Sequence, residues 1–180
     1  MKKILLLAIF FIFLLVPVQV FAQEVEGTPS AEVKVEYALP YPGLLPDSPF
    51  YILRTARDRI ISFLISNPLK KAEFDLLQAD KRLAAGMYLA NKDKYELANV
   101  TISKGENYFE SALAKAEEAR KQGIAIDAIA SSLYHSSRKH QEVIGELEQK
   151  TKGDLRARFS KEAKRAVEFE KKAELLTSRK

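Results

Sequence analysis

The sequence predicts an all-α protein, an antiparallel bundle of three long helices with a short N-terminal helix, a proline-rich docked arm and a C-terminal basic helix. Three observations favour this fold. Apolar residues recur at spacings of three and four along most of the chain after residue 67. Pro49 and Pro68, the last two prolines, both lie at predicted helix starts. The segments between the long helices are short, so consecutive helices must run antiparallel.

The first 22 residues have the three parts of a signal peptide. A positively charged start is followed by an almost entirely apolar run, residues 4–18, and then by Val-Phe-Ala at residues 20–22. Small residues placed in this way precede signal-peptidase cleavage sites, so we expect a cut between Ala22 and Gln23. The remainder is expected to be extracytoplasmic, secreted or periplasmic.

An uncleaved anchor is the alternative for the same segment. Residues 4–22 are just long enough to cross a bilayer, with Lys2 and Lys3 on the inner side. Both interpretations place the rest of the chain outside the cytoplasm. They differ in whether it is released or held at a membrane.

A linker and an arm precede the helices. Residues 23–36 are small and charged and lack helical periodicity, which predicts a flexible linker. Residues 37–51 contain four prolines and a glycine among aromatic residues and leucines, a composition that disfavours helix. We expect a docked arm that covers the groove of the bundle; the alternative is a recognition segment for a partner. The candidate contact residues of this arm are Tyr41, Pro42, Pro46, Phe50 and Tyr51.

Two residue pairs ending in proline mark the first helix starts. Ser48 can cap free backbone N–H groups before Pro49, and the short first helix is expected to reach about residue 66. Asn67 precedes Pro68 in the same way, so the second helix is expected to run to about residue 91. The buried stripe of the second helix consists of Leu69, Ala72, Leu76, Asp80, Leu83, Met87 and Ala90.

The next two helices follow from the same spacing. The third, residues 93–122, carries small residues on its stripe, which predicts close helix packing. Gly123 is a plausible C-terminal stop, and the fourth helix then runs to about residue 150. Its stripe consists of Ile126, Ile129, Leu133, Ser136, His140, Val143 and Leu147. These helices complete a predicted bundle domain over residues 37–150.

A fifth helix, residues 151–180, is set apart by its charge. Residues 150–180 contain 11 basic and 5 acidic residues, whereas the formal charge of the whole chain is +5. We expect a solvated face; the functional alternative is contact with anionic lipid headgroups or wall polymers. Nucleic acid is not expected as a partner, because the leader predicts export.

Signatures of enzymes are missing from the sequence. It contains no glycine-rich phosphate loop, no nucleophile elbow, no zinc-protease motif and no calcium loop. Cysteine is absent, which removes disulfides, thiolate nucleophiles and thiolate metal ligands. We therefore predict a non-enzymatic protein without catalytic residues, cofactor or metal.

Asp80 and His140 are polar residues at core positions. They lie at comparable heights on two helices that should run parallel, so their side chains can meet. We expect a buried structural pair in which the carboxylate holds the imidazole. The alternative is a ligand or metal site that uses both residues. His135, five positions before His140, faces another direction and is expected at the surface.

Three segments carry a resemblance to a known family. They read LPYPGLLPDSPFYILR at residues 39–54, NPLKKAEFDLLQADKRLA at residues 67–84 and SSRKHQEVIGELE at residues 136–148. In these motifs the chain resembles domain-of-unknown-function family 5667, over roughly residues 37–150. The resemblance implies an exported or membrane-tethered helical protein of bacteria or archaea. It transfers no activity to any residue, and the fifth helix lies outside it.

These observations together predict an extracytoplasmic helical module with an interaction or structural role at the cell envelope. Its partner would be an envelope protein or wall polymer, and the fifth helix is a candidate contact with an anionic membrane surface. The alternative is a sensor that binds a small ligand or metal in the bundle interior. An open pocket beside Asp80 and His140 would favour the sensor.

Overall fold

The computed structural model describes residues 35–178. The predicted leader, the cleavage site between Ala22 and Gln23, and residues 23–34 of the predicted linker lie outside the described residues. Within the described range, none of the helices is long and apolar enough to span a bilayer.

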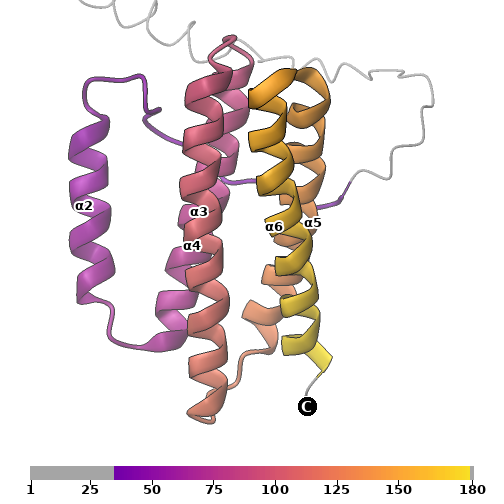
Figure 1. Cartoon of the computed structure of the whole chain (residues 1–180). Helices are drawn as coiled ribbons and strands as arrows, with labels where there is room; N and C mark the ends of the chain where they lie inside the picture. Colours follow the sequence, from indigo (N-terminus) through magenta and orange to yellow (C-terminus); the bar gives the residue numbers. More distant parts are fainter. Residues whose placement is uncertain (1–34, 179–180) are drawn as a thin grey trace, which may run out of the picture. The chain divides into compact units, whose positions relative to one another are not determined.

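The described chain forms an all-α bundle, as predicted (Figure 1). Its helices are α2 (Tyr51–Leu64), α3 (Pro68–Ala90), α4 (Tyr95–Lys121), α5 (Asp127–Lys150) and α6 (Gly153–Ser178). Helices α3 and α4 pack against each other, as do α5 and α6, and α4 also contacts α6. Helix α2 makes few contacts with the bundle and lies on its outside.

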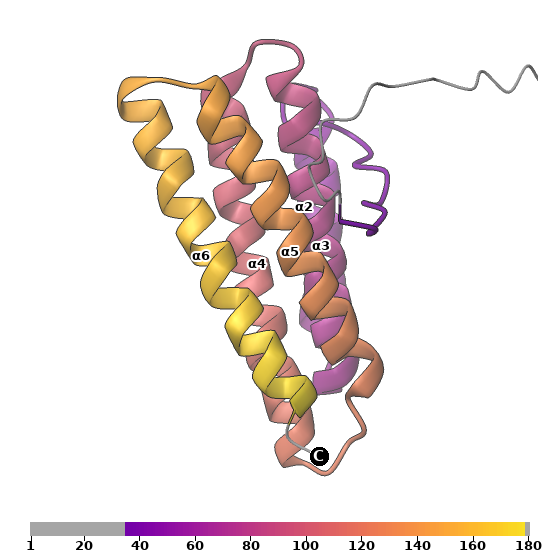
Figure 2. The same ribbon diagram turned by 90° about the vertical axis from the view of Figure 1, so that its right-hand side faces the viewer.

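Helix α6 is the fourth long helix of the bundle (Figure 2). The charge of residues 151–180 predicts a basic helix separate from the bundle domain. In the structure, α6 inserts Phe159 and Phe169 into the core, and both side chains are buried. The described residues, 35–178, therefore belong to one compact unit that includes α6.

The helix starts follow the predicted capping pattern at one site and depart from it at the other. The Asn67 side chain accepts a hydrogen bond from the Lys70 amide at 3.0 Å, so α3 begins as predicted. Helix α2 begins at Tyr51, two residues later than Pro49. The Tyr51 amide donates to the Ser48 carbonyl at 3.1 Å, which closes a turn over the intervening residues before the helix starts.

The core consists of two apolar clusters stacked along the bundle. One cluster contains Ala72, Leu76, Ala79, Phe109, Ala112, Leu113, Ala116, Ala119, Ile126, Ile129, Ala130, Leu133, Phe169, Ala173 and Leu176. The other contains Leu83, Leu89, Ala90, Ala98, Ile102, Val143, Ile144, Leu147, Phe159 and Ala166. Both clusters lie within residues 72–176, so a chain that starts at Gln23 retains the complete core.

Helices α3 and α4 approach closely because glycine occupies two contact positions. A Cβ atom on Gly86 would lie 2.4 Å from Cγ1 of Ile102 on α4. A Cβ atom on Gly105 would lie 3.2 Å from the carbonyl oxygen of Ala79 on α3. The small residues of the predicted third helix therefore serve close packing, as expected.

Candidate functional site

A layer of polar side chains separates the two apolar clusters, and we call it the polar layer. It consists of Asp80 from α3, Glu106 from α4, and Ser136 and His140 from α5, all of them buried. His140 lies between the two carboxylates, with Nδ1 2.6 Å from Glu106 Oε1 and Nε2 3.1 Å from Asp80 Oδ1. The Ser136 hydroxyl donates to Asp80 Oδ1 at 2.5 Å. These contacts connect α3, α4 and α5 at one level along the bundle axis.

The carboxylates determine the charge of His140. Burial alone would lower the pKa of this imidazole, but Glu106 and Asp80 raise it to about 9. At neutral pH the ring is therefore an imidazolium that donates one hydrogen bond to each carboxylate. The ring of Phe109 packs edge-on against it, with centroids 5.0 Å apart. Apolar packing and ion pairing together fix the imidazole.

The N-terminal arm covers the polar layer. The Tyr37 hydroxyl donates to Asp80 Oδ2 at 2.6 Å, and the Val35 amide donates to Glu142 on α5 at 2.8 Å. Burial and the negative charge of Asp80 raise the pKa of Tyr37, so this hydroxyl keeps its proton at neutral pH. The arm is therefore docked, as the fold prediction stated.

The other end of the arm is held by the turn between α3 and α4. Lys94 Nζ lies 2.7 Å from Asp47 Oδ2. The hydrogen bond from Lys94 lowers the pKa of Asp47, which stays ionised. This contact is at the surface, so it adds little to the free energy of unfolding. Its main effect is to fix the course of the arm.

The geometry of the polar layer favours a structural role. Both nitrogens of His140 are occupied by carboxylates on opposite sides of the ring, so the three side chains do not converge on one point. Among residues 35–178, no group of three or more histidine and acidic side chains is arranged to hold a metal ion. A buried ionic layer of this kind favours one helix register over others.

The structure brings Asp80 and His140 together and leaves His135 exposed. Sequence reasoning missed Glu106 and Tyr37. Glu106 follows Ile102 by four residues, a core spacing that could have identified it. Tyr37 reaches Asp80 from outside any helical pattern, and no periodic signal marks it.

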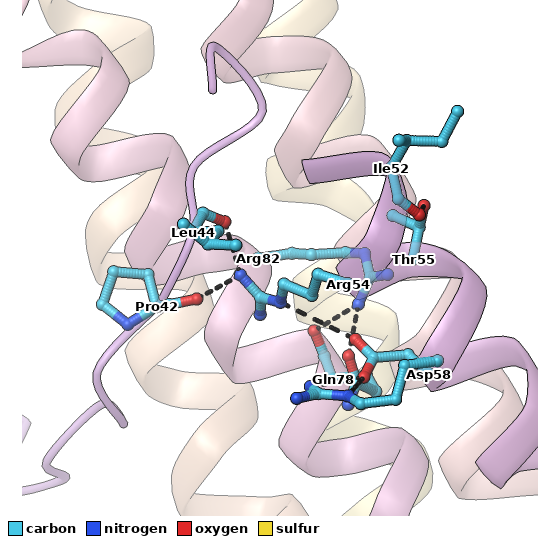
Figure 3. A network of polar contacts seen from close by, with 9 residues as sticks. Pro42, Leu44, Ile52, Arg54, Thr55, Asp58, Gln78 and Arg82 are labelled. Carbon is cyan, nitrogen blue, oxygen red and sulfur yellow. Dashed lines mark hydrogen bonds and ion pairs between the residues drawn. The ribbon is translucent and has the colours of Figure 1, made fainter. Parts of the chain in front are cut away.

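Helix α2 meets the rest of the molecule through polar groups (Figure 3). Arg54 donates to the Pro42 carbonyl and, at 2.7 Å, to the Leu44 carbonyl of the arm. Asp58 is only 3% exposed and lies 2.7 Å from the guanidinium of Arg57. Burial lowers the pKa of Arg54, whose guanidinium lies 3.7 Å from Asp58.

The helix below α2 also presents polar groups to it. Figure 3 shows Gln78 and Arg82 of α3 close to Arg54 and Asp58 of α2. Arg82 donates to the Gln78 side chain at 3.0 Å, and its guanidinium lies 4.1 Å from the Tyr108 ring centroid. Polar side chains therefore lie between α2 and α3, where Lys71 Nζ of α3 also donates to the Ser62 carbonyl of α2 at 2.9 Å.

The apolar side chains of α2 point away from the bundle. Phe63 is 86% exposed and Ile52 is 72% exposed, and Figure 3 shows Ile52 directed away from the Arg54 contacts. We define the outward face of α2 as Ile52, Leu53, Ala56, Ile60, Phe63 and Leu64, all exposed. A soluble helix usually buries this side. Contiguous apolar faces exposed to solvent are typical of interaction sites in soluble proteins.

The candidate contact residues of the arm divide into two groups. Tyr41 and Phe50 are exposed, at 77% and 63%, and lie near the start of α2. Pro42 is buried, whereas Pro46 and Tyr51 are half-buried. Only Tyr41 and Phe50 are exposed enough to extend the outward face of α2.

The basic residues of α6 are largely engaged. Arg158 Nη2 lies 2.6 Å from Glu96, and this hydrogen bond raises the pKa of Arg158. Arg165 lies 2.9 Å from Glu162 on its own helix and 3.3 Å from Glu110 on α4. These pairs join α6 to the bundle, while its role as a membrane contact stays a prediction.

Comparison with known proteins gives one finding. A family model described as "Domain of unknown function (DUF5667)" matches residues 43–154. The match covers α2, α3, α4 and α5, more than half of the chain. No curated protein and no solved structure matches the chain significantly.

Proposed function

Because the chain belongs to the DUF5667 family, whose function is unknown, we propose a function from its own surfaces. It is a non-enzymatic, extracytoplasmic helical module that acts at the cell envelope by contact. The contact surface is the outward face of α2, extended by Tyr41 and Phe50. The four-helix bundle is the rigid support that presents this surface.

One observation carries the proposal: α2 exposes its apolar side and buries its polar side. Exposure of that many large apolar side chains is unfavourable in water, by roughly 25 cal/mol for each Å² of apolar surface left unburied. A partner that covers this face would recover that free energy. In the polar layer, by contrast, Asp80 and Glu106 both bond to His140 inside the bundle.

The extracytoplasmic location is supported by the sequence of residues 1–22. Recovery of the chain outside the cytoplasm, with Gln23 at its N-terminus, is the expected result of N-terminal sequencing after cell fractionation. A chain recovered only in the cytoplasm would refute this part of the proposal.

Site-specific crosslinking tests the contact surface. A photoreactive amino acid is placed at Phe63 on the outward face, or at Val100 on α4, which is also exposed. After irradiation of intact cells that export the chain, we expect reproducible adducts with an envelope component from position 63 and none from position 100. Equal labelling from both positions, or none from either, would refute an interaction role for α2.

A further inference from the structure

We propose that α2 lies on an anionic lipid surface, with its outward face among the acyl chains and lipid phosphates beside it. This inference rests on the proposed function and names the partner. Two independent features of α2 support it, the distribution of residues around the helix and the clefts along its sides.

The residues of α2 are distributed as in a helix that lies in a membrane interface. Its outward face is entirely apolar, and Arg57 and Arg59 lie at the two edges of that face. Its single acidic residue, Asp58, is on the opposite side and buried. Arginines at the edges reach phosphates while their stems stay in apolar surroundings.

A cleft with a cationic lining runs along one side of α2. It has a volume of about 530 Å³ and lies between α2, α3 and α4. Arg59, Arg82 and Lys104 line it, together with Ile52 and Ala56 of the outward face. The described residues that line this cleft include no carboxylate. An anion in it would therefore sit directly beside the apolar face.

A second cleft, on the other side of α2, has the same character. It has a volume of about 460 Å³ and is lined by Arg54, Arg57 and Lys81, with Leu53 from the outward face. Its described lining also lacks aspartate and glutamate, although Arg54 and Arg57 pair with Asp58 of their own helix, so Lys81 is the lining cation that forms no ion pair within residues 35–178. An apolar ridge with cations on both flanks matches the profile of a bilayer, in which phosphates lie above the acyl chains.

Charge favours a lipid surface over a second copy of the chain. Pairing of two outward faces would place the arginine edges of both copies together, with no acidic side chain on either face to compensate.

Vesicle sedimentation tests the inference on the chain from Gln23 to Lys180, which contains the complete core. We expect binding to vesicles of equal parts phosphatidylcholine and phosphatidylglycerol at low salt. Binding should weaken as salt screens the arginines, and vesicles of phosphatidylcholine alone should bind far less. Absence of binding to the mixed vesicles at low salt would overturn the inference.

Two pairs of substitutions locate the contact. Ile60→Asn with Phe63→Asn removes apolar area from the outward face, and we expect about tenfold weaker binding or more. Arg59→Gln with Lys104→Gln removes two cations that form no ion pair within residues 35–178, and we expect a loss of similar size. Circular dichroism verifies that each variant remains folded.

Matched controls lie on α6. Leu175→Asn removes an exposed apolar side chain, and Lys161→Gln with Lys164→Gln removes two exposed cations. Both control variants should bind as the unmodified chain does. If the α6 lysine variant loses binding and the α2 variants do not, the membrane surface is α6 and the inference is wrong.

Inorganic phosphate distinguishes a lipid surface from a simple anion site. At equal ionic strength, phosphate should displace the protein from mixed vesicles no better than chloride does. Phosphate binding without vesicle binding would overturn the inference. If vesicle binding is absent while position 63 still crosslinks to an envelope protein, the inference of a lipid partner is wrong. The proposed interaction role of α2 would still hold.

Discussion

At the scale of single residues, His140 has the most constrained environment in the described chain. It is fully buried, and its single positive charge, shared by two nitrogens, faces two carboxylates that have little access to water. Taking such ions out of water costs free energy that their mutual attraction largely offsets. Removal of one partner leaves that cost without compensation.

We expect His140→Leu to lower the free energy of unfolding by about 3–5 kcal/mol, because Asp80 and Glu106 would remain buried without a cation. Urea denaturation measures the change. His135→Leu is the matched control, since His135 is exposed, and its effect should stay within about 0.5 kcal/mol. Equal effects of the two substitutions would contradict the assigned role.

The raised pKa of His140 predicts stability that depends on pH. Its value in the folded chain is about 9, above the ordinary 6.5, so protonation stabilises the fold. This contribution is complete below about pH 6.5 and is lost as the pH rises through about 9. We expect a decrease on the order of 3 kcal/mol, measured by urea denaturation across that range. The decrease should be absent in His140→Gln.

Gly86 tests the close approach of α3 and α4. Gly86→Ala should destabilise the fold by about 1–3 kcal/mol, because the new Cβ collides with Ile102. Gly145→Ala on α5 is the control, since nothing lies within 4 Å of its added Cβ. The control should stabilise the protein by about 0.5–1 kcal/mol through helix propensity. Thermal unfolding of both variants provides the comparison.

Single residues also show what sequence reasoning can reach. Asp80 and His140 interrupt apolar stripes, and that interruption alone marks them as buried polar groups. Glu106 is harder to identify because the adjacent Gly105 also fits the apolar spacing of this helix. The contact of Tyr37 depends on how the arm crosses the bundle, which no local spacing encodes.

At the scale of elements, α2 is the helix whose orientation the sequence left open. Pro49 predicts a helix start. The helix is amphipathic, however, and the sequence does not show whether its apolar side faces the bundle or the solvent. The bonds from Arg54 to the arm and from Lys71 of α3 to Ser62 hold α2 with its polar side toward the bundle. Such long-range contacts are invisible to periodicity, so the docking face could not be predicted.

We expect the amides of α2 to exchange with solvent much faster than those of α3, α4 and α5. Its contacts with the bundle are few and polar, so it can open without unfolding the core. Hydrogen exchange followed by mass spectrometry measures this difference. Addition of the anionic vesicles should slow exchange in residues 51–64, while equal exchange in all helices would contradict a loosely held α2.

At the scale of the whole molecule, the bundle architecture was predictable because helix length and short turns leave few alternatives. The part that the fifth helix plays in the core was not predictable in this way. Its charge suggested a separate basic tail, yet the apolar residues on its other side complete the core. In a long amphipathic helix, the buried side decides the architecture even when the charged side dominates the composition.

Removal of residues 153–180 should abolish cooperative unfolding. The truncated chain loses Phe159 and Phe169 and exposes the apolar surfaces of α4 and α5 that they cover. Thermal unfolding followed by circular dichroism should change from a sharp to a broad transition. A chain that lacks only residues 1–22 should keep the sharp transition, and a sharp transition in both would contradict the role of α6.

The course of the arm determines which contacts a pulling force on the N-terminal side acts on first. A force applied at residue 35 acts first on the bonds from Val35 to α5 and from Tyr37 to Asp80 on α3. Breaking the Tyr37 bond removes one of the three donors to Asp80, so tension on the N-terminal side alters the electrostatics of His140. The contacts at the start of the described chain are thus connected through Asp80 to the ion pairs in the middle of the bundle.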